Sequence, residues 1–230
     1  NLNMHMPSFS SDFSFNADWN KNRPKTLKEL AQSPYFKSAF SNPKIKRFSL
    51  IALDSYTWIS TNTSDNDRKI YCDIEYEAVY DLADYLLKEY NGTGKTFIIQ
   101  TWESDAWLVA SSVGNNATYN MDSVRNYRDW ITARQNAVNA ARAANPGSDV
   151  KLYNCMEIST VATKGKLLTD VIPATRCDLY AYSVWENLVY GYSLDANLKL
   201  FKSYVPASGT VGSKNYYVGE YGMPEMNYGR

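Results

Sequence analysis

Two glutamates have a setting that suits acid–base chemistry. Each follows an apolar run typical of a buried strand: Glu103 ends residues 95–103 and Glu220 ends residues 216–220. A carboxylate beside such a run is costly to bury unless it emerges at the open end of the strand. In a barrel of parallel strands, that carboxyl end is where catalytic groups gather. Two carboxylates from different strands can divide the acid and nucleophile roles that cleave a glycosidic bond.

Other side chains expected at or just beyond strand ends could assist them. Glu157 ends the apolar run 150–157 and could hold the acid role or contact a substrate, with a structural hydrogen bond as the alternative. Aromatic rings that could stack on a sugar, or pack in the core instead, are Trp58, Trp102, Trp107, Tyr182 and Trp185. Asp54 and Asp105 could be hydrogen-bonding groups of the same site or serve in loops and helix caps.

The composition excludes several other kinds of chemistry. The 24 basic residues cancel the 24 acidic ones, so no net charge favours nucleic acid or a membrane surface, and no apolar stretch approaches the length of a membrane helix. His5 is the only histidine, which argues against a histidine zinc site or a Ser-His-Asp triad. Three cysteines favour buried free thiols over a disulfide framework. The sequence therefore predicts a soluble protein that uses carboxylates, with no metal and no cofactor.

The elements that must position these groups alternate along the chain. Residues 1–22 form a loop-rich segment whose first residues could end a strand, and a capping box at Thr26 opens a short helix limited by Pro34. Strands are expected at 47–54, 95–103, 150–157, 178–183 and 216–220, and helices at about 74–86, 124–141, near 166 and at 194–204. Alternating strands and helices predict an α/β fold with parallel strands and helical crossovers, in a single domain over residues 1–230.

With these elements in place, the chain resembles the (β/α)8-barrel glycoside hydrolases, in particular the large clan with an acid/base Glu ending strand four and a nucleophile Glu ending strand seven. If the strand of Phe48 is strand three, then Glu103, Glu157, Ser183 and Glu220 fall on strands four to seven. The resemblance implies a retaining hydrolase of a poly- or oligosaccharide, with Glu103 as acid/base and Glu220 as nucleophile. It also implies that no cofactor takes part.

The resemblance has departures that bear on fold and function. The clan usually has Asn before the acid/base residue, where this chain has Trp102. A complete barrel typically takes about 250 residues, and ten residues follow Glu220, so we expect a TIM barrel that is incomplete or a fragment. The alternatives are a non-catalytic carbohydrate-binding barrel and a structural, partner-binding α/β protein. A chain that starts without Met, together with a polysaccharide substrate, favours an extracellular or periplasmic location.

Overall fold

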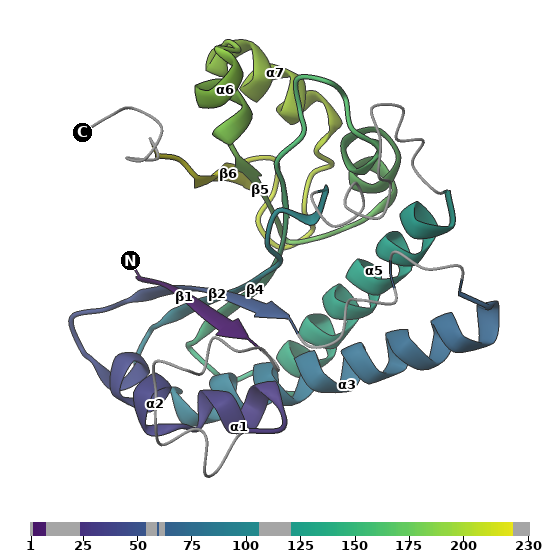
Figure 1. Ribbon diagram of the computed structural model, residues 1–230. Coiled ribbons are helices and arrows are strands. Elements are labelled where there is room, and N and C mark those ends of the chain that lie inside the picture. The colour runs from purple at the N-terminus through teal and green to yellow at the C-terminus, as the bar shows by residue number, and fades with distance from the viewer. Residues whose placement is uncertain (1, 8–23, 54–58, 60–62, 106–120, 223–230) are drawn as a thin grey trace. The chain divides into compact units, whose positions relative to one another are not determined.

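The computed structural model describes residues 2–7, 24–53, 59, 63–105 and 121–222. Its strands within these residues are β1 (Leu2–Pro7), β2 (Arg47–Leu53), β3 (Thr96–Gln100), β4 (Lys151–Ile158), β5 (Leu179–Ser183) and β6 (Tyr216–Glu220). Its α-helices are α1 (Leu27–Ala31), α2 (Pro34–Ser41), α3 (Asp65–Glu89), α5 (Met121–Ala144), α6 (Trp185–Tyr190) and α7 (Leu194–Tyr204). A π-helical turn, η4 (Leu167–Val171), and a 3₁₀ turn, η5 (Ile172–Ala174), follow β4 (Figure 1).

The strands are hydrogen-bonded in the order in which they occur along the chain, β1-β2-β3-β4-β5-β6. β1 pairs with β2, β2 with β3, β4 with β5, and β5 with β6, in each case in parallel. Parallel neighbours need a crossover between them, and helices or helical turns occupy these connections. This confirms the predicted α/β class. The six strands of the described part do not amount to an eight-stranded barrel.

By its internal contacts the chain divides into two compact units. The first comprises residues 1–58, 63–101 and 132–154, and the second comprises residues 59–62, 102–131 and 155–230. Strand β4 and helix α5 each contribute residues to both units.

An aromatic cluster forms much of the core of the first unit. Phe48 of β2 and Phe97 of β3 stack at 5.1 Å, and Phe40 of α2 meets both rings edge-on. Beside this cluster, the buried Lys95 donates from Nζ to the carbonyl oxygens of Asn42 and Ile45, at 2.8 and 2.7 Å. The lysine charge is thus met by backbone acceptors at the start of the β3 segment, as a buried cation requires.

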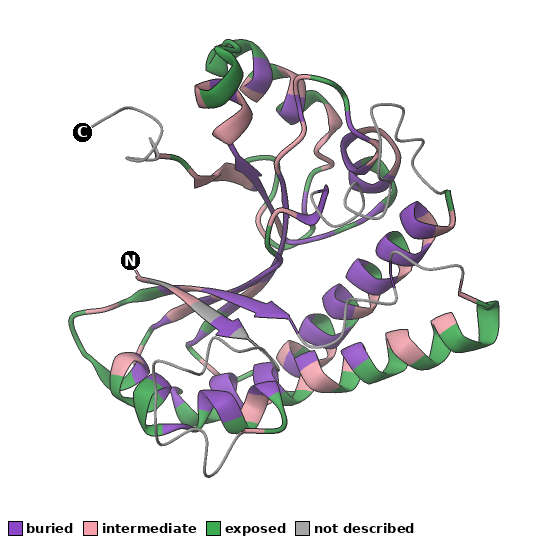
Figure 2. Ribbon diagram, viewed as in Figure 1, coloured by how far each residue is buried: buried purple, intermediate pink, exposed green. Residues whose placement is uncertain are grey.

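A buried ion pair joins three elements of the same unit. Glu75 of α3 and Arg134 of α5 are 1% and 0% exposed, and their side chains are hydrogen-bonded. The Arg134 Nη2 also donates to the carbonyl oxygen of Ala52 on β2, at 2.8 Å. The pair therefore ties both long helices to the strand, and Figure 2 shows that the buried part of α3 is the part from Glu75 onward.

Most local expectations agree with the structure, but α3 begins at Asp65 rather than at about residue 74, and β3 ends at Gln100 rather than at residue 103. The Thr26 side chain caps α1 by accepting from the Glu29 backbone N–H at 3.1 Å. Pro34, expected only to limit that helix, opens α2 at a position where its missing N–H leaves no helical bond unmade. Ile74, one of the apolar residues whose spacing predicts one face of the helix at 74–86, is 45% exposed. Helix α6 was not expected.

The second unit supplies strand ends and loops that hold a pocket. Tyr182 of β5 packs against Phe201 of α7, and the Phe201 ring also meets Tyr216 of β6. These contacts seat α7 on the β5–β6 pair. The carboxyl ends of β5 and β6, at Ser183 and Glu220, lie next to each other because the pairing register shifts between Tyr182 and Ser183.

Candidate active site

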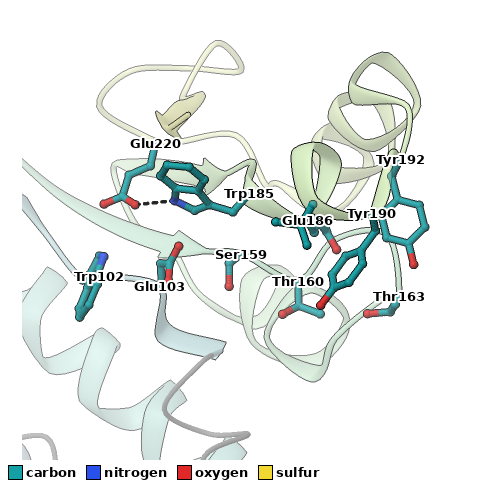
Figure 3. A pocket seen from close by; sticks show the side chains of 11 residues that line it. Trp102, Glu103, Ser159, Thr160, Thr163, Trp185, Glu186, Tyr190, Tyr192 and Glu220 are labelled. Atoms are coloured by element: carbon teal, nitrogen blue, oxygen red, sulfur yellow. Dashed lines mark hydrogen bonds between the residues drawn. The ribbon is translucent and has the colours of Figure 1, made fainter. Parts of the chain in front are cut away.

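A pocket of about 560 Å³ opens in the second unit at the carboxyl ends of β5 and β6. Its size falls within the usual range for small-molecule sites. The lining residues are Trp102, Glu103, Ser159, Thr160, Thr163, Trp185, Glu186, Val189, Tyr190, Tyr192 and Glu220 (Figure 3). Both glutamates singled out in the sequence are therefore on its wall.

One hydroxyl connects the two glutamates. The Ser183 Oγ donates to Glu103 Oε1 at 2.8 Å and lies 3.3 Å from Glu220 Oε2, also in hydrogen-bond geometry. The distance between the nearest oxygens of the two carboxyl groups therefore cannot exceed the sum of these two hydrogen-bond lengths. This limit admits the roughly 5–5.5 Å that separates the two carboxyl groups in retaining glycosidases.

Glu103 has an unusual backbone and an altered acidity. It lies three residues beyond the end of β3, and its φ of 30° is rare for a residue other than glycine. Such conformations concentrate at functional sites, where the surroundings hold them in place. Burial raises the pKa of the Glu103 carboxyl, the Ser183 hydrogen bond lowers it, and the Glu220 charge raises it again, with a net upward shift.

Glu220 is held by two donors. At the end of β6, its Oε2 accepts from the Trp185 indole N–H at 2.9 Å and from the Ser183 hydroxyl. Figure 3 shows the Trp185 nitrogen directed at this carboxylate. The Trp185 ring in turn packs closely on Gly222. A Cβ added at Gly222 would lie only 3.0 Å from Cη2 of the indole.

Glu157 lies beneath the pocket rather than on its wall. It is fully buried, and its Oε2 accepts from the backbone N–H of Glu103 at 3.2 Å. Its Oε1 lies against Gly219, where a Cβ would come within 2.1 Å. This is the structural hydrogen bond that the sequence left as the alternative to an acid or substrate-contact role, and the carboxylate touches the segments that carry both Glu103 and Glu220.

The aromatic residues singled out from the sequence take different places. Trp102, 39% exposed, and Trp185 line the pocket. Tyr182 does not: it is fully buried, and its hydroxyl donates at 2.6 Å to Glu186 or Asn187. Of the two alternatives left open for Tyr182, sugar stacking and core packing, the structure shows core packing, because the side chain packs against Phe201 of α7. Trp58, Trp107 and Asp54 lie outside the described residues.

Two carboxylates hold the loop after β4. Asp105 is fully buried and accepts from the backbone N–H groups of Ser159 and Thr160, at 3.0 and 2.7 Å. Burial raises the pKa of Asp105 to about 6, although these two hydrogen bonds lower it. Glu186 Oε1 likewise accepts from Val161 and Ala162 N–H, at 2.8 and 2.9 Å. Asp105 therefore has the loop-bracing duty that the sequence left as one of its two alternatives.

Several residues in or directly behind the pocket were not foreseen from the sequence. Ser183 was placed at a strand end but given no role, because the shared hydrogen bond depends on how two strands pair. Tyr190 and Tyr192 were missed because α6 has only six residues, too few for a readable periodicity.

Within the described ranges, no group of three or more His, Cys, Asp or Glu side chains could hold a metal ion. No helix in the part of the chain that the structure describes is long and apolar enough to cross a membrane. Cys72, Cys155 and Cys177 form no disulfide among the described residues; Cys155 and Cys177 are buried, as expected, whereas Cys72 is half-buried.

A scan against protein-family models and searches among curated proteins and solved structures found no match to this chain.

Proposed function

We propose that the protein is a retaining glycoside hydrolase acting on a poly- or oligosaccharide, with Glu103 as acid/base and Glu220 as nucleophile. The observation that carries this proposal is the Ser183 hydroxyl, which bonds to both carboxylates at one end of the pocket. Two carboxylates this close can act on the same bond, one at the leaving oxygen and one at the sugar carbon.

The reaction would run in two steps. Glu220 attacks the anomeric carbon and forms an ester with the sugar, while Glu103 gives its proton to the departing glycosidic oxygen. Glu103, now a carboxylate, then takes a proton from water as that water attacks the anomeric carbon and releases Glu220. Two inversions at the anomeric carbon leave its configuration unchanged.

The electrostatic setting supports this division of roles. The acid must hold a proton before the first step, and burial raises the pKa of Glu103. Glu220 accepts hydrogen bonds from Trp185 and Ser183, which fix the direction of its carboxylate. Trp102 and Trp185 add flat apolar surfaces to the pocket, as sugar binding needs.

The wider setting belongs to the same proposal. A retaining hydrolase of this kind would have the (β/α)8 barrel, of which the parallel strands described here would form a part. A polysaccharide substrate would also place the protein outside the cell or in the periplasm.

Turnover, stereochemistry and trapping test the proposal together. We expect hydrolysis of at least one member of a panel of β-linked glucan, xylan and mannan tetrasaccharides, with the β-anomer seen first by NMR. A 2-deoxy-2-fluoro glycoside of the same sugar should label Glu220, as read by mass spectrometry of peptides. Label on another residue would refute the assigned nucleophile, and an inverted product would refute the retaining mechanism.

A carbohydrate-binding protein without catalysis is the second candidate. Trp102, directly before Glu103 and exposed in the pocket, is the observation that favours it, because the ring could serve binding alone. Binding of the same tetrasaccharides by calorimetry with no turnover would favour this candidate. A Glu220→Gln variant that still binds but loses the wild-type turnover would favour the enzyme.

A further inference from the structure

Two tyrosines at the other end of the pocket have no part in the chemistry above. Tyr190 ends α6 and Tyr192 follows it, and both line the pocket while remaining 70% and 42% exposed. Their ring centroids lie 5.8 Å apart with the planes at 48°. Exposed aromatic rings that border a cavity are surfaces a ligand can cover, unlike rings packed in a core.

The backbone around this tyrosine pair is held in place. Gly191, between the two rings, has a φ of 70° and ends α6 in the left-handed conformation that glycine favours. The side chain of Asn187 donates to the carbonyl oxygen of Tyr192 at 3.1 Å, and its own Oδ1 accepts from the buried Tyr182 hydroxyl. The position of Tyr192 is therefore tied to the core of the unit.

A row of hydroxyls lies on the same pocket. Ser159, Thr160 and Thr163 come from the loop after β4, which Asp105 and Glu186 hold by its backbone N–H groups. Figure 3 shows Thr160 and Thr163 close to the Tyr190 and Tyr192 side chains. Rings that offer apolar faces, next to hydroxyls that donate and accept, complement a sugar unit with an apolar face and a hydroxyl-bearing edge.

The loop also tells which side of the scissile bond this end of the pocket serves. Asp105, which binds the Ser159 and Thr160 N–H groups, is two residues from Glu103, so the hydroxyl row belongs to the acid's side of the pocket. An acid that protonates the leaving oxygen faces the leaving group.

We propose that Tyr190 and Tyr192, with the hydroxyl row, bind the sugar that leaves in the first step. This inference rests on the proposed function and deepens it. The substrate is then a chain of at least two sugars, and the group that leaves in the first step is itself a sugar. A glycoside whose leaving group is a small alcohol would not use this site.

The test compares two kinds of leaving group in a Tyr190→Ala/Tyr192→Ala double variant. The tetrasaccharide that the wild type hydrolyses best supplies a sugar leaving group, and the β-glycosyl fluoride of the matching disaccharide supplies a single atom that cannot reach the tyrosines. We expect kcat/KM for the tetrasaccharide to fall about 10- to 100-fold, as loss of two stacking rings predicts, and kcat/KM for the fluoride to change less than about two-fold. Tyr35→Ala, at a tyrosine of α2 with 41% exposure, is the matched control and should change neither.

The outcomes separate this inference from the proposed function. A tetrasaccharide-specific loss supports the leaving-group site. Equal losses on both substrates, or no loss on either, overturn it while the hydrolase proposal stands. A wild-type protein that hydrolyses no probe overturns the proposed function, and this inference with it.

Discussion

At the scale of single residues, the Ser183 hydroxyl has one proton to offer to two carboxylates. Its hydrogen bond lowers the pKa of Glu103 against the effects of burial and of Glu220, so it holds the acid less firmly protonated than the pocket alone would. Ser183 therefore acts as a positioning residue with an electrostatic effect.

Replacing this serine should move the pH profile of the proposed reaction. In Ser183→Ala the lowering hydrogen bond is lost, so the pKa of Glu103 rises and the alkaline limb of kcat/KM shifts to higher pH. We expect kcat/KM near neutral pH to fall about ten-fold through lost positioning. The profile is measured on the best tetrasaccharide, with Ser203→Ala on the outer side of α7 as control. A shift of the alkaline limb to lower pH would contradict this reasoning.

Removing the acid should affect substrates unequally. Glu103→Gln keeps the shape of the side chain but has no proton to give, so cleavage of sugar leaving groups should slow by about 10²- to 10⁴-fold. A glycosyl fluoride leaves with less help and should slow much less in its first step. Single-turnover kinetics on both substrates measures the difference, and equal losses would argue that Glu103 is not the acid.

Asp105 should give the protein a pH-dependent stability. Its folded-state pKa of about 6 is raised above the unfolded value, so its contribution is fully present below pH 4 and is lost as pH rises through about 6. Over that pH range the contribution of Asp105 to the free energy of unfolding changes by an amount on the order of 3 kcal/mol. Asp105→Asn, which keeps one acceptor, should be less stable than wild type at every pH.

The difference between wild type and Asp105→Asn in unfolding free energy isolates this residue from other titrating groups. It should be largest near pH 4 and shrink toward pH 7, as measured by urea denaturation. A difference that grows with pH would mean that Asp105 is stabilised as the carboxylate.

At the scale of elements, the Glu157 side chain of β4 and the Ala181 side chain of β5 lie so close to β6 that one of its positions excludes a side chain. A Cβ at Gly219 would lie 2.1 Å from Glu157 Oε1 and 3.1 Å from the Ala181 Cβ. Gly219→Ala must then push the Glu157 carboxylate away from the Glu103 backbone N–H. We expect a loss of about 1–3 kcal/mol in stability and a marked loss of turnover.

The control for this variant is Gly209→Ala in the same unit, where an added Cβ meets nothing within 4 Å. Thermal unfolding and turnover are measured on both variants. Wild-type behaviour of Gly219→Ala would show that β6 can shift without disturbing the two glutamates.

The elements themselves could largely be predicted from apolar runs and caps. β2 and α7 follow the expected boundaries almost to the residue, because a buried strand and an amphipathic helix each have a distinct periodicity. The two unexpected helices have other causes: α2 begins at a proline, and α6 is a six-residue segment. Ile74 was misplaced because the buried Glu75 beside it takes an inner position on α3.

The site was less accessible to prediction than the elements. Glu103 and Glu220 could be singled out because carboxylates after apolar runs are unusual. The bridging role of Ser183 and the buried place of Tyr182 depend on strand pairing and on which helix covers which face. No local pattern of residues reveals either.

At the scale of the whole molecule, a buried ion pair contributes to the stability of the first unit. Glu75→Gln leaves the Arg134 charge buried with only a neutral partner in place of the carboxylate. We expect the free energy of unfolding to fall by about 3–5 kcal/mol. Replacing both residues, in Glu75→Leu/Arg134→Met, should recover much of the loss, because no charge is then buried.

Chemical denaturation of the single and double variants measures this coupling. The exposed pair of Lys69 and Asp73 on the same helix is the comparison, and Asp73→Asn should leave the transition midpoint unchanged. A double variant less stable than Glu75→Gln would mean that the ion pair itself favours the fold.

The division of the chain into two units has a practical meaning for anyone who shortens this protein. Each unit is assembled from three separate stretches of sequence. No single cut can therefore release one of them whole: a fragment that begins at Trp102 keeps Glu103 and Glu220 but also carries residues 132–154, which belong to the other unit and would lose their partners there. A minimal version would have to be made by rejoining segments in a new order, not by trimming the ends.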